Sequence, residues 1–200
     1  MKHIYEVEEY FYSIQGEGAN VGVPAFFIRL KGCDVCCPWC DSKSTWHRGD
    51  GMMMDDEKLA EIVKDSGAKK MVITGGEPFM QDLHPLTVAL KNTGIKIMVE
   101  TSGTHPLSGI IDWVCLSPKR FKKPLPEAFE RADEIKVVIA SKEDFEWAEE
   151  CYSKVRKSCK LFLQPEWNGS KQMLKEIIEY VQEHQKWRIS LQTHKYMNIR

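Results

Sequence analysis

The sequence lacks long apolar segments. No apolar run approaches the roughly 18 residues that a membrane-spanning helix needs, and the first residues, MKHIYEVEEYFYS, lack the apolar stretch of a signal peptide. Excess charge is also missing, because 28 lysines and arginines nearly balance 29 aspartates and glutamates. A strongly basic surface for nucleic acid is therefore not expected. These absences predict a cytoplasmic protein that acts neither on a membrane nor on nucleic acid.

The sequence also lacks internal repeats, low-complexity segments and linkers. Its 200 residues, 42% of them hydrophobic, suit one globular unit with a sizeable core. We therefore expect a single domain over residues 1–200.

Short apolar runs alternate with amphipathic segments along the chain. Alternation of this kind predicts an α/β fold with a parallel sheet. The expected strands are 25–30, 71–75, 95–101, 113–117, 134–139, 161–164 and 188–192, and the expected helices are 55–67, 83–94, 142–157 and 170–185.

The spacing of these elements is irregular. Residues 101–112 and 118–133 are too short or too rich in proline to hold full crossover helices. A complete eightfold barrel needs about 250 residues, which is more than this chain has. We therefore expect a shortened, open (partial) TIM-like barrel of about six parallel strands.

Polar or glycine-containing segments follow most of the expected strands. Each segment alone could be a turn or a strand stop, but the carboxyl ends of strands form the active-site face of barrel-like α/β folds. We expect six segments to meet at one rim: a cysteine-rich loop after the first strand, TGGEP (74–78), ETSG (100–103), SPK (117–119), QP (164–165) and QTHK (192–195).

The segment KGCDVCCPWCDSKSTW (31–46) holds four of the seven cysteines. In a reducing cytoplasm such a cluster indicates metal or redox chemistry rather than disulfides. Paired as Cys33-x-x-Cys36 and Cys37-x-x-Cys40, the thiols would suit a zinc site. Interpreted as Cys33-x3-Cys37-x2-Cys40, they give three ligands and leave Cys36 out. Adjacent residues seldom direct their side chains to one ion, which favours three ligands.

Three thiolates at this spacing can hold three irons of a 4Fe-4S cluster and leave the fourth iron without a protein ligand. Four thiolates suit outer-sphere electron transfer, whereas an open iron lets a substrate or cofactor chelate the metal. With this triad and GGEP (75–78), the sequence resembles the radical S-adenosylmethionine (radical SAM) superfamily. The resemblance implies Cys33, Cys37 and Cys40 as cluster ligands, and SAM as a cofactor that is cleaved to a 5′-deoxyadenosyl radical.

The same resemblance implies a set of SAM-binding residues. Glu77 would contact the methionine amino group, and Trp39 would pack near the adenine. The other implied positions are two glycines and four polar residues at strand ends: Gly75, Gly76, Ser102, Ser117, Lys119 and Gln164.

A narrower resemblance starts in FYSIQGEGANVGVPAFFIRLKGCDVCCPWCDSKSTW (11–46) and continues to LQTHKYMNIR at the carboxyl end. Over nearly the whole chain, the sequence is similar to the 7-carboxy-7-deazaguanine synthase family of lyases in queuosine and deazapurine biosynthesis. This likeness implies radical ring contraction of 6-carboxy-5,6,7,8-tetrahydropterin to 7-carboxy-7-deazaguanine, with loss of ammonia. QTHK (192–195) is discriminating because it is not expected in other superfamily members.

This resemblance also implies the substrate site. Gln15, Glu17, Arg29 and His194 match binding positions, and the last three are the expected catalytic residues. An arginine can bind a carboxylate through two hydrogen bonds. Glu17 can accept hydrogen bonds from the amino edge of a pterin.

A magnesium ion is implied at the end of the cysteine loop. There the family commonly has Cys-Asp-Thr, and this chain has Cys40-Asp41-Ser42. Serine supplies the same hard oxygen donor as threonine, so Ser42 is the expected ligand. The family further implies a reductant such as a flavodoxin or ferredoxin, and a homodimer.

Two other classes of protein remain open from the sequence. One is a non-catalytic module stabilised by zinc, bound by all four clustered cysteines or by three of them with His47. The other is an activating enzyme of the glycyl-radical type, which shares the cysteine triad. That enzyme would need a protein substrate and has no reason to keep QGEG (15–18) or QTHK (192–195).

Overall fold

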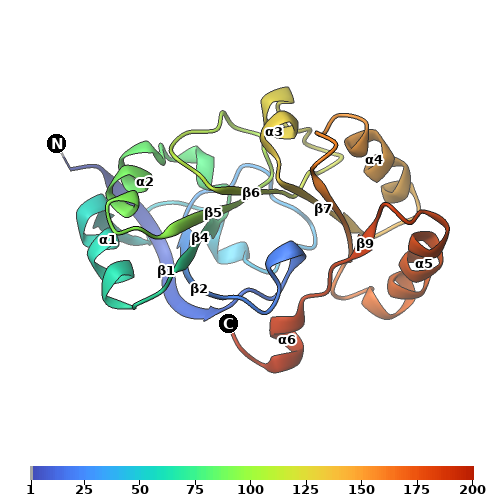
Figure 1. Ribbon diagram of the computed structural model, residues 1–200, viewed down its shortest axis with the longest axis horizontal. Coiled ribbons are helices and arrows are strands. Elements are labelled where there is room, and N and C mark those ends of the chain that lie inside the picture. Colours follow the sequence, from blue (N-terminus) through green and yellow to red (C-terminus); the bar gives the residue numbers. More distant parts are fainter. Residues whose placement is uncertain (1) are drawn as a thin grey trace.

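The computed structural model describes residues 2–200, and its main feature is a nine-stranded sheet. The strand order is β3-β1-β2-β4-β5-β6-β7-β8-β9, and helices lie along the outer side of the curved sheet (Figure 1). The strands are β1 (Ile4–Ile14), β2 (Pro24–Leu30), β3 (Met52–Asp55), β4 (Lys70–Gly75), β5 (Lys96–Thr101), β6 (Trp113–Leu116), β7 (Glu134–Ile139), β8 (Lys160–Pro165) and β9 (Arg188–Ile189). The helices are α1 (Asp56–Asp65), α2 (His84–Lys91), α3 (Pro126–Arg131), α4 (Glu143–Tyr152), α5 (Ser170–Glu183) and α6 (Thr193–Met197), with short 3-10 turns at Gly18–Asn20, Lys43–Thr45 and Pro78–Met80.

The parallel part of the sheet consists of β2 and β4 to β9, which pair in sequence order. The chain adds β1 antiparallel to β2, and β3 antiparallel to β1. Because β3 and β9 lie at opposite ends of the strand order, the sheet does not close. The predicted α/β class and open, partial barrel are confirmed, with seven parallel strands instead of about six.

The four helices expected from the sequence are present as α1, α2, α4 and α5. The amino end of α1 shows why its start could be predicted, since the Asp55 side chain accepts a hydrogen bond from the Lys58 amide at 2.7 Å. The proline-rich segment 118–133 holds only the six-residue α3, as its composition predicts.

Strands β1 and β3 are absent from the sequence prediction. The acidic run EVEEY in β1 does not resemble a strand, yet Glu6 is only 3% exposed. Its carboxylate accepts hydrogen bonds from Arg48 Nε at 2.9 Å and from the amides of Gly49 and Gly51. The free-energy cost of burying this charge is offset by hydrogen bonds from partners more than forty residues away. No local sequence pattern therefore reveals that Glu6 is buried.

Strand β9 is shorter than the expected 188–192. The Ser190 amide still bonds Leu163 O at 2.9 Å, but the chain then leaves the sheet. The Thr193 amide instead bonds Gly16 O at 2.9 Å. This departure brings the carboxyl-terminal segment against the residues that follow β1.

The core lies mainly between the sheet and its outer helices. Cys115, Cys151 and Cys159 are all buried, in agreement with a packing role. Within residues 2–200, no helix combines the length and apolar character needed to cross a membrane.

Candidate active site

A cavity of about 280 Å³ lies at the carboxyl ends of the parallel strands. It is lined by most residues that the sequence singled out: Gln15, Glu17, Arg29, Cys33, Cys37, Trp39, Cys40, Ser42, Gly75, Gly76, Ser102, Ser117, Lys119, Gln164 and His194. Segments from both ends of the chain therefore meet in one place. Glu77 is the predicted site residue that does not line this cavity.

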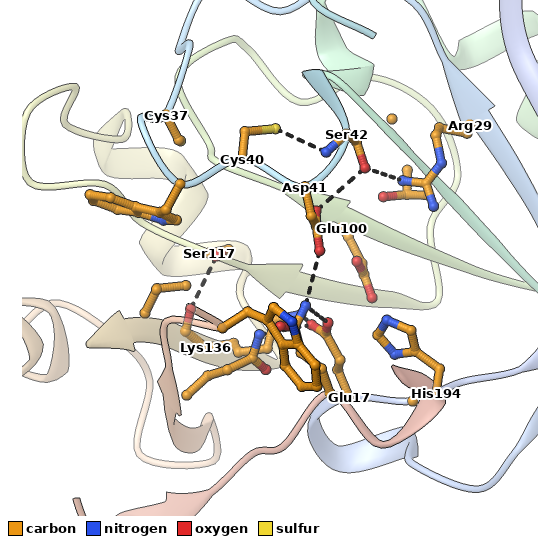
Figure 2. A pocket seen from close by; sticks show the side chains of 18 of the residues that line it. Glu17, Arg29, Cys37, Cys40, Asp41, Ser42, Glu100, Ser117, Lys136 and His194 are labelled. Atoms are coloured by element: carbon orange, nitrogen blue, oxygen red, sulfur yellow. Dashed lines mark hydrogen bonds and ion pairs between the residues drawn. The ribbon is translucent and has the colours of Figure 1, made fainter. Parts of the chain in front are cut away.

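The cavity has two chemically different ends. Figure 2 shows Cys37 and Ser117 on one side and Arg29 and His194 on the other, with Asp41 and Glu100 between them. The first side carries thiols and strand-end hydroxyls, and the second carries charged and hydrogen-bonding groups. This separation fits a site in which one bound group reacts with another.

The cysteine loop is held by backbone hydrogen bonds. The Cys33 amide donates to Trp46 O at 3.0 Å, and the Cys40 amide donates to Cys37 O at 3.0 Å. Burial raises the pKa of the Cys33 and Cys37 thiols, so both are protonated at neutral pH without a metal. A bound metal would have to displace these protons.

Cys36 differs from the other three thiols of the loop. It is exposed, has a positive φ of 50°, and donates its thiol proton to Cys33 O at 3.3 Å. Cys33, Cys37 and Cys40 line the cavity, and Cys36 does not. The left-handed backbone at Cys36 separates its side chain from that of Cys37.

Gly75 and Gly76 place the end of β4 against the cysteine loop. A Cβ on Gly76 would lie 2.3 Å from Gly32 O and 2.7 Å from Cys33 Cβ, and Gly75 has a φ of +141°. The Gly76 amide bonds Leu30 O at 3.0 Å, and the next amide, that of Glu77, bonds Gly32 O at 2.8 Å. Side chains at these glycines would push the cysteine loop away from the sheet.

Glu77 follows these two glycines and is buried, with 1% of its surface exposed. Its carboxylate accepts hydrogen bonds from Thr101 Oγ1 at 2.6 Å, from the Ser102 amide at 2.8 Å and from the Ser102 hydroxyl. In this structure, Glu77 therefore joins the end of β4 to the end of β5.

Lys119 and Ser117 form a compact pair on the thiol side. Lys119 Nζ donates to Ser117 O at 2.6 Å and to Ser117 Oγ at 2.7 Å. Burial lowers the pKa of Lys119, although the nearby Cys37 opposes this effect.

Glu17 is the centre of a buried hydrogen-bond network on the other side. Its carboxylate pairs with Lys136 Nζ and accepts hydrogen bonds from Gln164 Nε2 at 3.2 Å and Gln192 Nε2 at 3.0 Å. Burial alone would raise the pKa of Glu17, but Lys136 outweighs that effect and the pKa is lowered. Glu17 is thus an anion at neutral pH.

Gln15 links this network to a second carboxylate. Gln15 Nε2 donates to Glu100 Oε1 at 2.9 Å, while Gln15 Oε1 accepts from the Glu17 amide at 3.1 Å. Burial would lower the pKa of Lys136, but the charges of Glu100 and Glu17 raise it well above its usual value. The cavity therefore contains a buried cation that pairs with the Glu17 carboxylate and lies in the field of the Glu100 carboxylate.

The Arg29 side chain forms an ion pair and a hydrogen bond with neighbouring residues. Its Nε pairs with Glu9 at 2.9 Å, and its Nη1 donates to Ser42 Oγ at 3.2 Å. In the part of the chain that the structure describes, Nη2 has no hydrogen-bond partner. Ser42 Oγ also lies 3.4 Å from Asp41 Oδ1, so the predicted magnesium ligand lies between a cation and an anion.

His194 reaches the cavity from the carboxyl-terminal segment. It packs so closely on Gly16 that a Cβ there would lie 2.2 Å from His194 Nδ1. Burial lowers the pKa of His194, although Glu17 opposes the shift, so the imidazole is neutral at pH 7. The adjacent Lys195 pairs with Asp41 at 2.9 Å and so ties α6 to the cysteine loop.

The sequence prediction missed four polar groups of this site: Asp41, Lys136, Gln192 and Lys195. A signal existed for Lys136, which lies inside the apolar strand EIKVVI just as Arg29 lies inside AFFIRL. Gln192 and Lys195 belong to QTHK, a discriminating segment in which only His194 was expected to have a role.

The donor set of the thiol side fits an iron–sulfur cluster with a bound cofactor. Three thiols project into one cavity from a single loop, which matches a cluster with one iron left open. In addition, the indole N–H of Trp46 is buried at the cavity wall and has no acceptor among the described residues. A buried donor of this kind is costly unless a bound group accepts its hydrogen bond.

Comparison with known proteins identifies the class. Residues 27–163 match the family model described as the radical SAM superfamily. The chain belongs to this superfamily, whose members use a 4Fe-4S cluster and SAM, so the prediction of these two cofactors is confirmed.

Similar proteins define a narrower family. The chain is 48% identical over 193 residues to 7-carboxy-7-deazaguanine synthase of Flavobacterium psychrophilum, covering 96% of this chain and 90% of that protein. It is 46% identical over 196 residues to the enzyme of the same name from Synechocystis sp., covering 98% and 94%. The crystal structure of QueE from Escherichia coli superimposes with a TM-score of 0.84 at 35% identity, over 94% of this chain and 93% of that one. Within the superfamily, the chain thus belongs to the 7-carboxy-7-deazaguanine synthases, and the zinc module is excluded.

Proposed function

We propose that this protein converts 6-carboxy-5,6,7,8-tetrahydropterin to 7-carboxy-7-deazaguanine and ammonia by a radical ring contraction, as one radical SAM domain over residues 1–200. One observation carries the proposal. Three loop thiols share a cavity with Glu17, Arg29 and His194, which come from three other parts of the chain. The name shared by relatives over nearly the full length supports the same reaction.

The thiol side would hold the cofactors. Cys33, Cys37 and Cys40 would bind the cluster, and the cluster with SAM would supply the radical chemistry that removes hydrogen from carbon 6 of the substrate. The Trp39 ring would pack near the adenine. Hydroxyl and backbone groups at Ser102 and at the strand ends would bind the rest of SAM.

The polar side would bind the pterin. Arg29 lines the cavity and its Nη2 has no hydrogen-bond partner among the described residues, so this nitrogen can bind the substrate carboxylate. Glu17 is held as an anion by Lys136 and can accept hydrogen bonds from the pterin N–H groups. The neutral His194 can exchange one proton with the substrate.

Magnesium would bind beside Ser42. Its hydroxyl and the Asp41 carboxylate supply hard oxygen donors at the junction of the two sides. Arg29 bonds the same hydroxyl, so magnesium binding would have to release or share that hydrogen bond.

We further propose a cytoplasmic homodimer that receives electrons from a flavodoxin or ferredoxin. The reducing conditions of the cytoplasm suit a chain whose seven cysteines are all free. The activating-enzyme alternative has less support, because the relatives that match over nearly the full length are named 7-carboxy-7-deazaguanine synthase, after a small-molecule product.

An anaerobic assay tests the proposed function. The reconstituted protein, given the carboxypterin, SAM and dithionite, should release a product with the mass of 7-carboxy-7-deazaguanine, together with ammonia. Many product molecules should form per SAM cleaved, because the family regenerates its cofactor. Omission of the carboxypterin is the control. Reductive SAM cleavage without that product would refute the proposed substrate.

A further inference from the structure

The turn of residues 118–123 lies directly against the cysteine loop. Lys122 Nζ pairs with Asp34 Oδ2 at 2.6 Å and donates to Asp34 O at 3.0 Å. Phe121 packs edge-on against Trp39 with ring centroids 5.7 Å apart. The turn is therefore joined to both the start and the end of the loop that bears the three thiols.

The outer side of this turn exposes one aromatic ring between two cations. Phe121 is 52% exposed, and the side chains of Arg120 and Lys123 are 52% and 62% exposed. Arg120 Nε lies 3.7 Å from Asp144 of α4, and Lys123 Nζ lies 3.4 Å from Glu150 and 5.5 Å from the centroid of the Trp147 ring. An aromatic anchor flanked by accessible positive charge is typical of a surface that binds an acidic protein.

The turn is also rigid enough to present these side chains. Lys119 and Lys122 form an isolated antiparallel bridge, and Trp147 Nε1 donates to Pro118 O at 3.4 Å. The Leu125 amide bonds Gly103 O at 2.8 Å just beyond the turn. Little conformational entropy would be lost when a partner binds.

We propose that Arg120, Phe121 and Lys123 form the docking surface for a small acidic one-electron carrier of the flavodoxin or ferredoxin kind. This inference rests on the proposed function, because that reaction needs a reduced cluster. In each encounter, the carrier would lose one electron and the cluster would gain one. The surface is next to the cysteine loop, because Phe121 packs on Trp39. Arg29 and His194 lie on the side of the cavity opposite Cys37 (Figure 2). A docked carrier would therefore leave the substrate side accessible.

A second positively charged surface is an alternative binding site for an acidic carrier. Residues 152–153 and 155–161 line a groove with Lys186 and Arg188 at the opposite, amino-terminal ends of β8 and β9. It contains Lys157 and Lys160, for which no ion pair is found within residues 2–200. If positive charge alone determined where an acidic carrier binds, the carrier would bind this groove. Substitutions in the groove and in the turn therefore distinguish the two sites.

The first experiment measures binding. The affinity of the reconstituted protein for an oxidised acidic bacterial flavodoxin is determined by isothermal titration calorimetry at two salt concentrations. Removal of both flanking charges by R120Q/K123Q should weaken binding on the order of fivefold and reduce its salt dependence. Phe121→Ala should weaken it about tenfold or more. The control K157Q/K160Q, with the same change in net charge, should bind like the wild type.

The second experiment separates docking from catalysis. Turnover is compared with dithionite and with reduced flavodoxin as electron source. R120Q/K123Q should keep the dithionite rate and raise the flavodoxin concentration needed for half-maximal rate. Unchanged flavodoxin affinity in R120Q/K123Q and Phe121→Ala, or weaker binding only in K157Q/K160Q, would overturn the proposed surface. If the wild type binds flavodoxin through this turn but makes no deazaguanine with either reductant, the proposed function fails and the docking surface stands.

Discussion

The Lys136 ammonium pairs with the Glu17 carboxylate in the cavity, and both side chains are nearly shielded from water. Lys136 comes from β7, and Glu17 follows β1, so the pair joins segments more than one hundred residues apart. Lys136 also lies in the field of Glu100, so one cation acts on the charge of two carboxylates of the cavity. This arrangement determines the charge that a substrate would meet.

Lys136→Met should destabilise the protein more than an exposed lysine substitution does. Removing one partner of a buried ion pair leaves an uncompensated charge, which costs about 3–5 kcal/mol. Urea unfolding measures this free energy. Lys58→Met is the control, because its partner Glu61 is also exposed and the unfolding midpoint should hardly move. Equal effects of the two substitutions would show that the buried pair contributes no more to the free energy of unfolding than the exposed pair does.

The contribution of the same pair should depend on pH. The pKa of Glu17 is lowered in the folded state, so its stabilisation is present above the unfolded pKa of about 4.3 and is lost as the pH falls through the folded value. The pKa of Lys136 is raised, so its contribution is lost only as the pH rises through the folded value, above about 10.4. In Lys136→Met, burial acts on Glu17 without an opposing cation and raises its pKa, so the variant relieves its buried charge by taking up a proton as the pH falls. The stability difference between wild type and Lys136→Met should therefore be largest at neutral to mildly alkaline pH and should narrow on acidification. A difference that grows on acidification would contradict this assignment.

Substitution of the clustered cysteines should divide them into two groups. Cys33→Ala, Cys37→Ala and Cys40→Ala should each lose most bound iron and sulfide after reconstitution, because each thiol lines the cavity. Cys36→Ala should retain both, since its thiol bonds only the Cys33 carbonyl. Iron and sulfide analysis with electron paramagnetic resonance checks this prediction. Loss of the cluster in Cys36→Ala with retention in Cys37→Ala would show that the ligand assignment is wrong.

Arg29→Lys should raise the KM for the carboxypterin about tenfold to a hundredfold, because a lysine keeps the charge but loses the planar fork. The melting temperature should change much less. Glu9→Gln is the matched control, since it breaks the Arg29 ion pair and leaves the guanidinium in place. If Glu9→Gln and Arg29→Lys lower stability equally and leave KM unchanged, Arg29 has a structural role only.

Ser42→Ala should raise the magnesium concentration needed for half-maximal activity by about tenfold or more, since loss of a ligand should weaken binding at least as much as loss of a neighbouring group does. The visible spectrum of the cluster should not change, because Ser42 lies outside the three thiols. Ser44→Ala, a change at an exposed serine of the same segment, is the control. If a chelator leaves wild-type activity intact, there is no functional magnesium site at Ser42.

The amino-acid sequence by itself determined the fold class, the three-thiol spacing and the family. These features are local: an apolar run predicts a buried strand, and the x3, x2 spacing on one loop limits which thiols can share a cluster. For the same reason, α1, α2, α4 and α5 were found close to their predicted positions.

Only the tertiary structure decided how distant charges are balanced. Nothing near Lys136 in sequence shows that it pairs with Glu17, and nothing near Glu6 shows that Arg48 and two backbone amides make its burial possible. The stabilisation of a buried charge depends on partners brought together by strand order and by loop packing, and a local sequence pattern contains no record of that order. For this reason β1 and Lys136 were missed. The packing of QTHK against QGEG joins the two ends of the chain, so only the family resemblance, and no local pattern, could predict it.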